Sequence, residues 1–443
     1  TAQAARFAHL VPGGTGGGAG AGGQRPGGQP PGGSIRRPTP AGGTSSDTTP
    51  QGVARKDSRG NNLDNYQRSI SQGSSRQDSN GSLQRKGSLG PGGRTPSGSS
   101  MHSDDYKSTP GADTGSLLKD INDNKDKPDI LRSKIHGLRN LAADEAGALP
   151  QIKSVMEKYR NDPRLMMASA GAVWAITTNS EERKKEAASA GCLELIVDMI
   201  RNGKTKDDSD ALQWAFGAIT SLARLDQNKK VITDMKGIEA ILEAIKRKER
   251  DSEIFEWGCR ALFSLVSGKE ENGHAGNFDR QISAIENYGG ISVIAGCMKI
   301  HHSESGPLWW AFKLLLRMQG RSDPNSTARS IQLMNEEDLA TTCIRIMTSR
   351  DQSSDVLIQC QALLMYLITN ASNQLMQHSA AEGIPYVAQF LSDDPQNSEL
   401  KVASAQFLAV VARDNLQAKR QIAQGKVVRL LLQGMTSAPE NLA

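Results

Sequence analysis

Five hydroxyl side chains near the start of the chain are spaced for phosphoryl transfer by a kinase. Each follows an arginine by three residues, and the five acceptors are Thr39, Ser58, Ser71, Ser79 and Ser88. A kinase with an acidic substrate pocket can pair with such an arginine, and each phosphate adds about −1.5 to −2 charges. The pattern predicts a phosphorylatable segment whose partners are kinases and phosphopeptide readers. The alternative is a solvated spacer, because serine and arginine are abundant here.

Other residue types that support chemistry show no catalytic or metal-binding pattern. His301 and His302 are adjacent, so on a helix they would point to different sides. The glycine-rich run 13–23 lacks the Gly-Lys-Ser/Thr of a phosphate loop. The cysteines form no C-x-x-C pair and are expected to be small buried hydrophobes: Cys192, Cys259, Cys297, Cys343 and Cys360. The sequence therefore predicts no enzyme, no metal and no cofactor.

Composition divides the chain into a tail and a folded part. Residues 1–115 hold 25 of the 44 glycines and 10 of the 18 prolines, so they cannot bury enough apolar surface to offset the entropy of ordering. We therefore expect a disordered Gly/Ser/Pro/Arg-rich tail over 1–118, a linker over 119–129 and a folded domain over 130–437.

Charge follows the same division. Residues 1–115 carry 13 basic against 7 acidic residues, a net +6, so the rest of the +5 chain is close to −1. A near-neutral folded part is not expected to bind nucleic acid, although the arginines of the tail leave RNA contact open. No apolar run approaches the roughly 18 residues of a membrane span, so no membrane partner is expected. The sequence favours a cytoplasmic protein, with the nucleus as the alternative compartment.

A repeat of 42 to 53 residues runs through the folded part. Each unit opens an apolar helix at an aligned glycine or aspartate, and the seven positions are Gly147, Gly191, Gly237, Gly290, Asp338, Gly383 and Gly425. We expect these residues to be left-handed, because a sharp corner between helices needs that conformation. In the unit from Gly191, an apolar helix is followed by a polar break, an alanine-rich helix and a short third helix that ends at Gly237.

This three-helix unit resembles the armadillo-repeat family over about residues 130–437. The resemblance implies an all-α fold, a right-handed α-solenoid of about six to seven repeats. The two-helix HEAT solenoid and a non-repetitive helical bundle are the alternative folds, and the short third helix argues against HEAT. The resemblance also implies a non-enzymatic protein-protein interaction scaffold or adaptor that binds extended partner segments in a groove lined by the alanine-rich helices.

Three tryptophans occupy the same position in successive alanine-rich helices. Trp214, Trp257 and Trp310 should form a row across neighbouring repeats, which is either a binding ladder or packing between repeats. Family members that carry nuclear-localisation signals have an asparagine ladder after the tryptophans. Here we assign that register to Thr178, Ser221, Ser264 and Arg317. The candidate groove residues are therefore Trp214, Trp257, Trp310, Ser221, Ser264 and Arg317.

Two other functions remain open at this point. A nuclear transport adaptor resembling importin-α would bind basic peptides, and the missing asparagines argue against it. A regulatory armadillo region of a larger enzyme would require a catalytic domain outside this sequence. The chain begins at Thr1 without a methionine, so we expect a fragment or a processed product.

Overall fold

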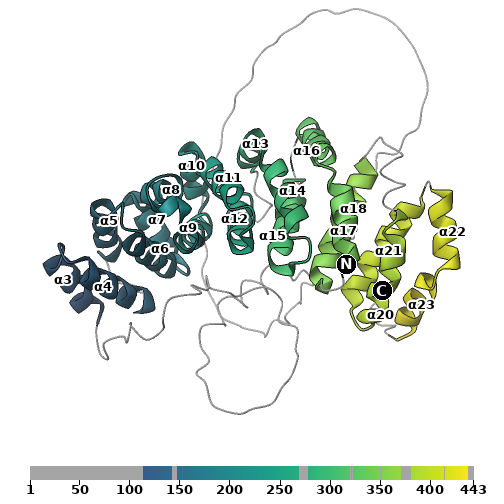
Figure 1. Cartoon of the computed structure of the whole chain (residues 1–443), viewed down its shortest axis with the longest axis horizontal. Coiled ribbons are helices and arrows are strands. Elements are labelled where there is room, and N and C mark those ends of the chain that lie inside the picture. Colours follow the sequence, from purple (N-terminus) through teal and green to yellow (C-terminus); the bar gives the residue numbers. More distant parts are fainter. Residues whose placement is uncertain are drawn as a thin grey trace, which may run out of the picture. The chain divides into compact units, whose positions relative to one another are not determined.

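The computed structural model describes residues 113–141, 147–268, 278–319, 321, 323–349, 352–370, 381–413 and 415–437, and in these residues it contains helices but no strand (Figure 1). The five predicted phosphate acceptors lie outside the described residues, so they stay a prediction.

Three kinds of helix recur in order along the chain. Each repeat is counted here from the short helix that stands third in the sequence unit, so the alanine-rich helices are the third helices. The first helices are α7 (Glu181–Ser189), α10 (Asp226–Asp234), α13 (Asp279–Asn287), α16 (Pro324–Glu336) and α22 (Leu416–Gln424). The second helices are α5 (Ala148–Lys158), α8 (Cys192–Arg201), α11 (Gly237–Arg247), α14 (Gly290–Ile300), α17 (Leu339–Thr348), α20 (Ile384–Asp393) and α23 (Val427–Ser437). The third helices are α4 (Pro128–Leu141), α6 (Pro163–Thr177), α9 (Ser209–Leu222), α12 (Ser252–Leu265), α15 (Ser305–Met318), α18 (Ser354–Asn370) and α21 (Ser398–Ala412). A 3₁₀ turn over Thr205–Asp207 precedes α9.

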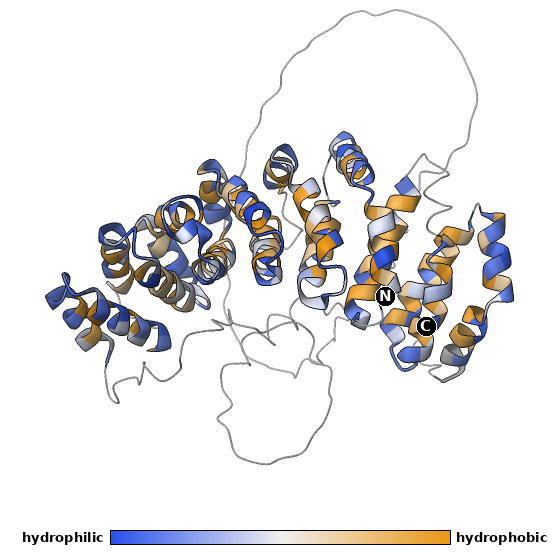
Figure 2. Cartoon of the chain, in the orientation of Figure 1, coloured by the Kyte–Doolittle hydropathy of each residue, from blue (hydrophilic) through white to orange (hydrophobic). Residues whose placement is uncertain are grey.

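Neighbouring repeats complete one another's core. Each third helix from α6 to α18 packs against the third helices before and after it. Each second helix from α5 to α14 contacts the next second helix, and each from α5 to α17 contacts the third helix of its own repeat. Figure 2 shows apolar residues gathered along one side of most of these helices. The prediction of an all-α solenoid of armadillo-type repeats is confirmed.

Helix starts and buried faces follow directly from the sequence. The side chains of Asp162, Asp208 and Asp251 accept hydrogen bonds from backbone N–H groups in the first turns of α6, α9 and α12. Such a cap stabilises a helix by about 1 kcal/mol. In α11, Ile238, Ile241, Leu242 and Ile245 recur at spacings of three and four and are all buried.

The predicted left-handed corners are correct at three of the seven positions. Gly147, Gly191 and Asp338 have φ angles of 95°, 88° and 52°. At Gly383 and Gly425 the prediction is wrong, because their φ angles are −73° and −80° and neither residue is left-handed.

The prediction is also wrong by one residue at Gly237 and Gly290. There the preceding residues, Lys236 and Gly289, are left-handed, with φ of 58° and 71°. The two glycines are needed for another reason. A Cβ on Gly237 would lie 2.8 Å from the Ile232 carbonyl oxygen, and one on Gly290 would lie 2.7 Å from the Ile285 carbonyl oxygen.

The predicted boundary of the folded part is corrected by helix α3, which spans Thr114–Asp123. The predicted tail, 1–118, and linker, 119–129, overlap this helix. The buried side chains of Leu117, Leu118 and Ile121 hold α3 against α4 and α5. Lys134 of α4 also pairs with Asp120 at 2.6 Å. The described folded part therefore starts earlier than residue 130.

Candidate binding surface

The third helices place tryptophans in one row. Trp214, Trp257 and Trp310 are each the sixth residue of a 14-residue helix, namely α9, α12 and α15, and these helices are neighbours. Trp174 lies near the end of α6 and joins the row between two of them. Its ring centroid lies 5.6 Å from that of Trp214 and 5.5 Å from that of Trp257, both in edge-to-face geometry. The row is therefore continuous from α6 to α12.

Two glycines make room for the first two rings. A Cβ on Gly171 of α6 would lie 2.9 Å from the Trp214 ring, and a Cβ on Gly217 of α9 would lie 3.1 Å from the Trp174 ring. Each helix thus supplies both a ring and the glycine that accommodates its neighbour's ring. The sequence analysis did not identify Gly171 and Gly217 as packing residues. The available signal was a glycine inside each helix, which costs about 1 kcal/mol relative to alanine unless packing needs it.

Cationic side chains lie over the rings. The Arg139 guanidinium of α4 is 5.0 Å from the Trp214 ring centroid. The Arg260 guanidinium of α12 is 4.5 Å from Trp257 and 5.2 Å from Trp310. The Lys313 ammonium of α15 is 4.1 Å from Trp309, which itself packs on Trp310. All these distances fall within the range of cation–π attraction. We call these residues the cation–tryptophan row: Arg139, Trp174, Trp214, Trp257, Arg260, Trp309, Trp310 and Lys313.

Burial differs along the cation–tryptophan row. Trp257 and Trp310 are each 4% exposed, whereas Trp174 and Trp214 are half-buried. The two buried rings therefore favour the packing interpretation, and the half-buried pair leaves ring surface within reach of a partner. Burial lowers the pKa of Arg139. It also lowers the pKa of Lys313, against the opposing effect of the Asp355 carboxylate.

The remaining predicted groove residues, Ser221, Ser264 and Arg317, all make contacts within the fold. Ser221 is 2% exposed and its Oγ lies 2.9 Å from Thr177 Oγ1, so it links α9 to α6 and a partner cannot reach it. Ser264 Oγ donates to the Arg260 carbonyl at 2.9 Å. The Arg317 guanidinium lies 5.4 Å from the Phe278 ring. The prediction that Ser221 lines the binding groove is therefore wrong, because the structure buries this side chain between α6 and α9.

The predicted asparagine register also needs a correction. Ser221, Ser264 and Arg317 follow the tryptophans by seven residues, whereas the family's asparagine follows by four. The residues at the fourth place are Ala218, Ala261 and Leu314, each fully buried. None is an asparagine, so the clamp that the resemblance implies is missing at either position.

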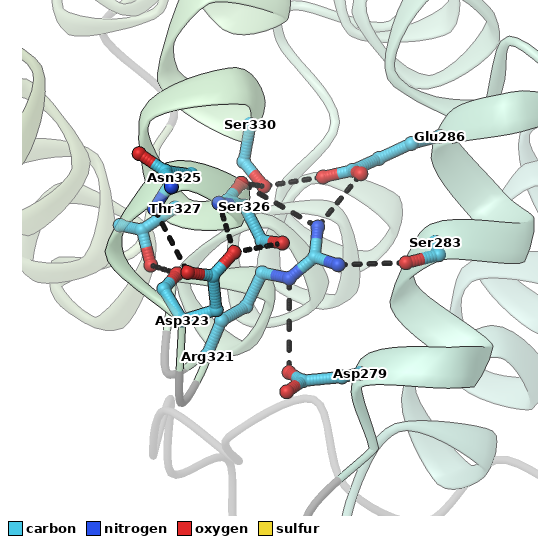
Figure 3. Close-up of polar contacts among 9 residues, drawn as sticks. All are labelled: Asp279, Ser283, Glu286, Arg321, Asp323, Asn325, Ser326, Thr327 and Ser330. Atoms are coloured by element: carbon cyan, nitrogen blue, oxygen red, sulfur yellow. Dashed lines mark hydrogen bonds and ion pairs between the residues drawn. The ribbon is translucent and has the colours of Figure 1, made fainter.

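A second polar cluster joins α13 to the connection before α16 (Figure 3). Arg321 Nη1 donates to Glu286 Oε2 at 2.7 Å, and Arg321 Nη2 donates to Ser283 Oγ at 2.7 Å. The Glu286 carboxylate also accepts from Ser330 Oγ of α16. The Arg321 and Glu286 side chains are 3% and 1% exposed. This cluster therefore holds two repeats together, and its two charged side chains have almost no exposed surface.

His301 and the five cysteines are buried within the fold. His301 Nδ1 lies 2.7 Å from Glu304 Oε1, and its Nε2 lies 2.8 Å from the Glu249 carbonyl oxygen. All five cysteines are buried, as predicted. Burial raises the pKa of Cys192 and Cys297 to about 12.

Within the described ranges, no helix is long and apolar enough to cross a bilayer.

Comparisons with known proteins add structural likenesses only. No protein-family model matches the chain, and no curated protein matches it. Among solved structures, an engineered protein is 20% identical with a TM-score of 0.48, over 58% of this chain and 98% of that one. A second engineered protein is 22% identical with a TM-score of 0.46, over 59% and 98%. A designed armadillo repeat protein in complex with the peptide (KR)4 is 15% identical with a TM-score of 0.46, over 60% and 100%. The fold assignment rests on the helices of this chain.

Proposed function

We propose that this protein is a non-enzymatic scaffold that binds extended segments of partner proteins across its third helices. The cation–tryptophan row carries the proposal, because its half-buried end, Trp174 and Trp214, combines ring surface with the Arg139 guanidinium. Tryptophan and arginine are the residue types that dominate binding energy at protein interfaces. The helices hold these groups in place before binding, which lowers the entropy cost of association.

The regular placement of the row favours an extended partner. Trp214, Trp257 and Trp310 recur once per repeat, on helices that pack side by side. Packed helices lie about 8–10 Å apart, a distance that about three residues of extended chain span. A segment crossing the third helices would therefore meet a similar group about every third residue.

The two alternative functions have less support. A nuclear transport adaptor would clamp a basic peptide with asparagines, and the corresponding places hold Ala218, Ala261 and Leu314. A regulatory region of a larger enzyme could use the same surface, and it would differ from a scaffold only in being joined to a catalytic domain. We place the protein in the cytoplasm, where a scaffold for protein segments can act without a transport role.

Selection of phage-displayed random peptides on the whole chain tests the proposal. We expect selected peptides to lose about tenfold or more of their affinity with Trp214→Ala and with Arg139→Gln, because both groups belong to the half-buried end of the row. Tyr288→Ala is the matched control, since Tyr288 is an exposed aromatic residue at the end of α13. Thermal melts would verify that each variant is folded. Equal loss with the control, or failure to select any peptide, would overturn the proposal.

A further inference from the structure

The twelfth residue of each third helix occupies one register position of the repeat. From α4 to α21 these residues are Arg139, Trp174, Thr220, Phe263, Leu316, Met365 and Ala409. We call them the twelfth-position row. Arg139 is the one charged member, and all the others except Thr220 are apolar. A segment that crosses the third helices would therefore meet a cation at one end and apolar side chains after it.

The middle of the twelfth-position row offers apolar surface. Trp174, Phe263 and Leu316 are half-buried and pack against the hydrophobic core. Thr220 of α9 is only 6% exposed. On that helix the half-buried Trp214 supplies ring surface instead, with its centroid 5.6 Å from that of Trp174. Apolar surface is thus within reach of a partner on the four neighbouring helices α6, α9, α12 and α15.

Arg139 differs from the other cations that lie over aromatic rings. Arg260, Lys313 and Arg317 each make a further interaction within the chain. The Arg139 guanidinium lies over the Trp214 ring, and within the described part of the chain no carboxylate pairs with it. Stacking on a ring leaves the in-plane N–H groups of a guanidinium able to donate hydrogen bonds. Arg139 is therefore the member of the cation–tryptophan row whose charge a partner can meet.

We propose that the partner segment has a single aspartate or glutamate whose carboxylate pairs with Arg139, and beside it an aliphatic or aromatic residue at about every third position that packs on the half-buried side chains of α6 to α15. This inference rests on the proposed function, because it names the partner of the same surface. Arginine can bind a carboxylate through two parallel hydrogen bonds, which gives specificity as well as affinity. The interval of three follows from the distance between packed helices.

The acidic first turns of the third helices do not oppose one carboxylate at Arg139. Asp129 and Asp210 lie ten residues before the twelfth positions of α4 and α9. At a rise of 1.5 Å per residue this separation is about 15 Å along the helix, which exceeds the screening length of about 10 Å at 0.1 M salt. Asp129 also pairs with Arg132 at 3.2 Å. The local charge at Arg139 therefore favours an anion.

A nucleic acid or a long acidic run fits the row less well. Both carry a charge at nearly every step, whereas the twelfth-position row has one cation followed by uncharged side chains. Nucleic-acid binding also needs many phosphates to be neutralised by lysine and arginine. The chain's own tail has 13 basic residues against 7 acidic over residues 1–115, so it is a poor match for Arg139.

The test measures binding of labelled synthetic peptides to the whole chain. One peptide has a single terminal glutamate and leucine at every third position, with serine and glycine between, and a second reverses this order. Both have capped, uncharged termini. We expect the better of the two to bind about tenfold more tightly than its counterpart with glutamine for glutamate, and than its counterpart with serine for leucine, at about 0.1 M salt. The inference is overturned if either counterpart binds equally well, or if oligothymidylate binds more tightly.

Single variants locate the two contributions. Arg139→Gln should remove the difference between the glutamate and glutamine peptides, and Arg139→Glu should shift the preference to a peptide with lysine in that place. Arg164→Gln is the charge-matched control, at an exposed residue in the first turn of α6. Leu316→Gln should weaken both peptides, and its control is Ile300→Gln, at a residue of α14 that is 43% exposed. A glutamate preference that persists in Arg139→Gln, or equal losses with Leu316→Gln and Ile300→Gln, would contradict the inference.

The two proposals can fail separately. If phage-selected peptides depend on Trp214 while the glutamate and glutamine peptides bind equally, the scaffold function stands and this partner chemistry is refuted. If no selected peptide depends on Trp214, the scaffold function itself fails. Thermal melts of all variants would show whether loss of binding reflects loss of the fold.

Discussion

At the residue scale, the burial of the tryptophan at the sixth position of a third helix depends on the residues around it. Trp214 and Trp257 are each the sixth residue of their helix, yet only Trp257 is buried. The ninth residue differs, being Gly217 in α9 and Arg260 in α12. Gly217 leaves room for the Trp174 ring, whereas Arg260 covers the rings beside it. The ninth residue therefore divides the row into two parts. Around Gly217, the Trp174 and Trp214 rings pack against the neighbouring helix, and beside Arg260 the guanidinium covers the Trp257 and Trp310 rings.

His136 should make the fold sensitive to acid. It is 3% exposed in α4, and burial together with Arg139 and Arg132 lowers its pKa from 6.5 to about 4. Below pH 6.5 the unfolded chain therefore binds a proton that the folded chain takes up only near pH 4. This group has no effect on stability above pH 6.5, and stability falls as pH decreases toward 4. We expect a loss of about 2 kcal/mol from His136 at pH 4.5.

Urea unfolding at pH 7 and pH 4.5 would measure this contribution. Carboxylates also titrate in this range, so the quantity of interest is the difference between the chain and its variants. His136→Gln and His136→Leu should each lose less stability than the unchanged chain over the same pH interval, whatever their stability at pH 7. Parallel losses in all three proteins would show that His136 does not titrate as inferred.

At the element scale, the sequence predicts what repeats and misses what is local to one junction. Apolar spacing and the aligned glycines predicted the helices and their stacking, because each unit needs its neighbours to bury its face. Arg321 and Glu286 could not be paired from the sequence, since their separation of 35 residues is shorter than any repeat and depends on the path between α15 and α16. Helix α3 was detectable from Leu117, Leu118 and Ile121, but the surrounding glycine-rich composition obscured it.

The Arg321–Glu286 pair should be strongly coupled. Removing one partner leaves a buried charge unpaired, so Arg321→Met or Glu286→Met alone should destabilise the fold by about 3–5 kcal/mol, while the double variant should cost much less than the sum. The exposed pair Arg280–Asp234, whose side chains are 55% and 46% exposed, is the control, and its coupling should stay below about 1 kcal/mol. Denaturant unfolding of both double-mutant cycles measures the coupling energies. Additive effects at Arg321 and Glu286 would show that the pair is not a unit.

At the scale of the whole molecule, stability comes from contacts between successive repeats. The third helices from α4 to α21 each contact the next, and the second helices form a parallel set of contacts. Removal of an end element therefore exposes the face of the next element rather than dismantling the core. The two ends of the described chain differ in this respect. Helix α3 covers α4 and α5, whereas α23 has an exposed Leu432.

Two truncations should consequently behave differently. Deleting residues 1–112 should change the melting temperature by less than about 2 °C, because that segment has too few apolar residues to contribute to a core.

Deleting residues 1–127 also removes α3, whose Leu117, Leu118 and Ile121 are buried. Each such side chain contributes about 1.5–3 kcal/mol, so backbone amides of α4 and α5 should lose protection from hydrogen exchange while those of α12 and α15 keep it. A large fall in melting temperature from the first deletion would mean that residues before 113 belong to the fold. Unchanged protection after the second would mean that α3 does not stabilise its neighbours.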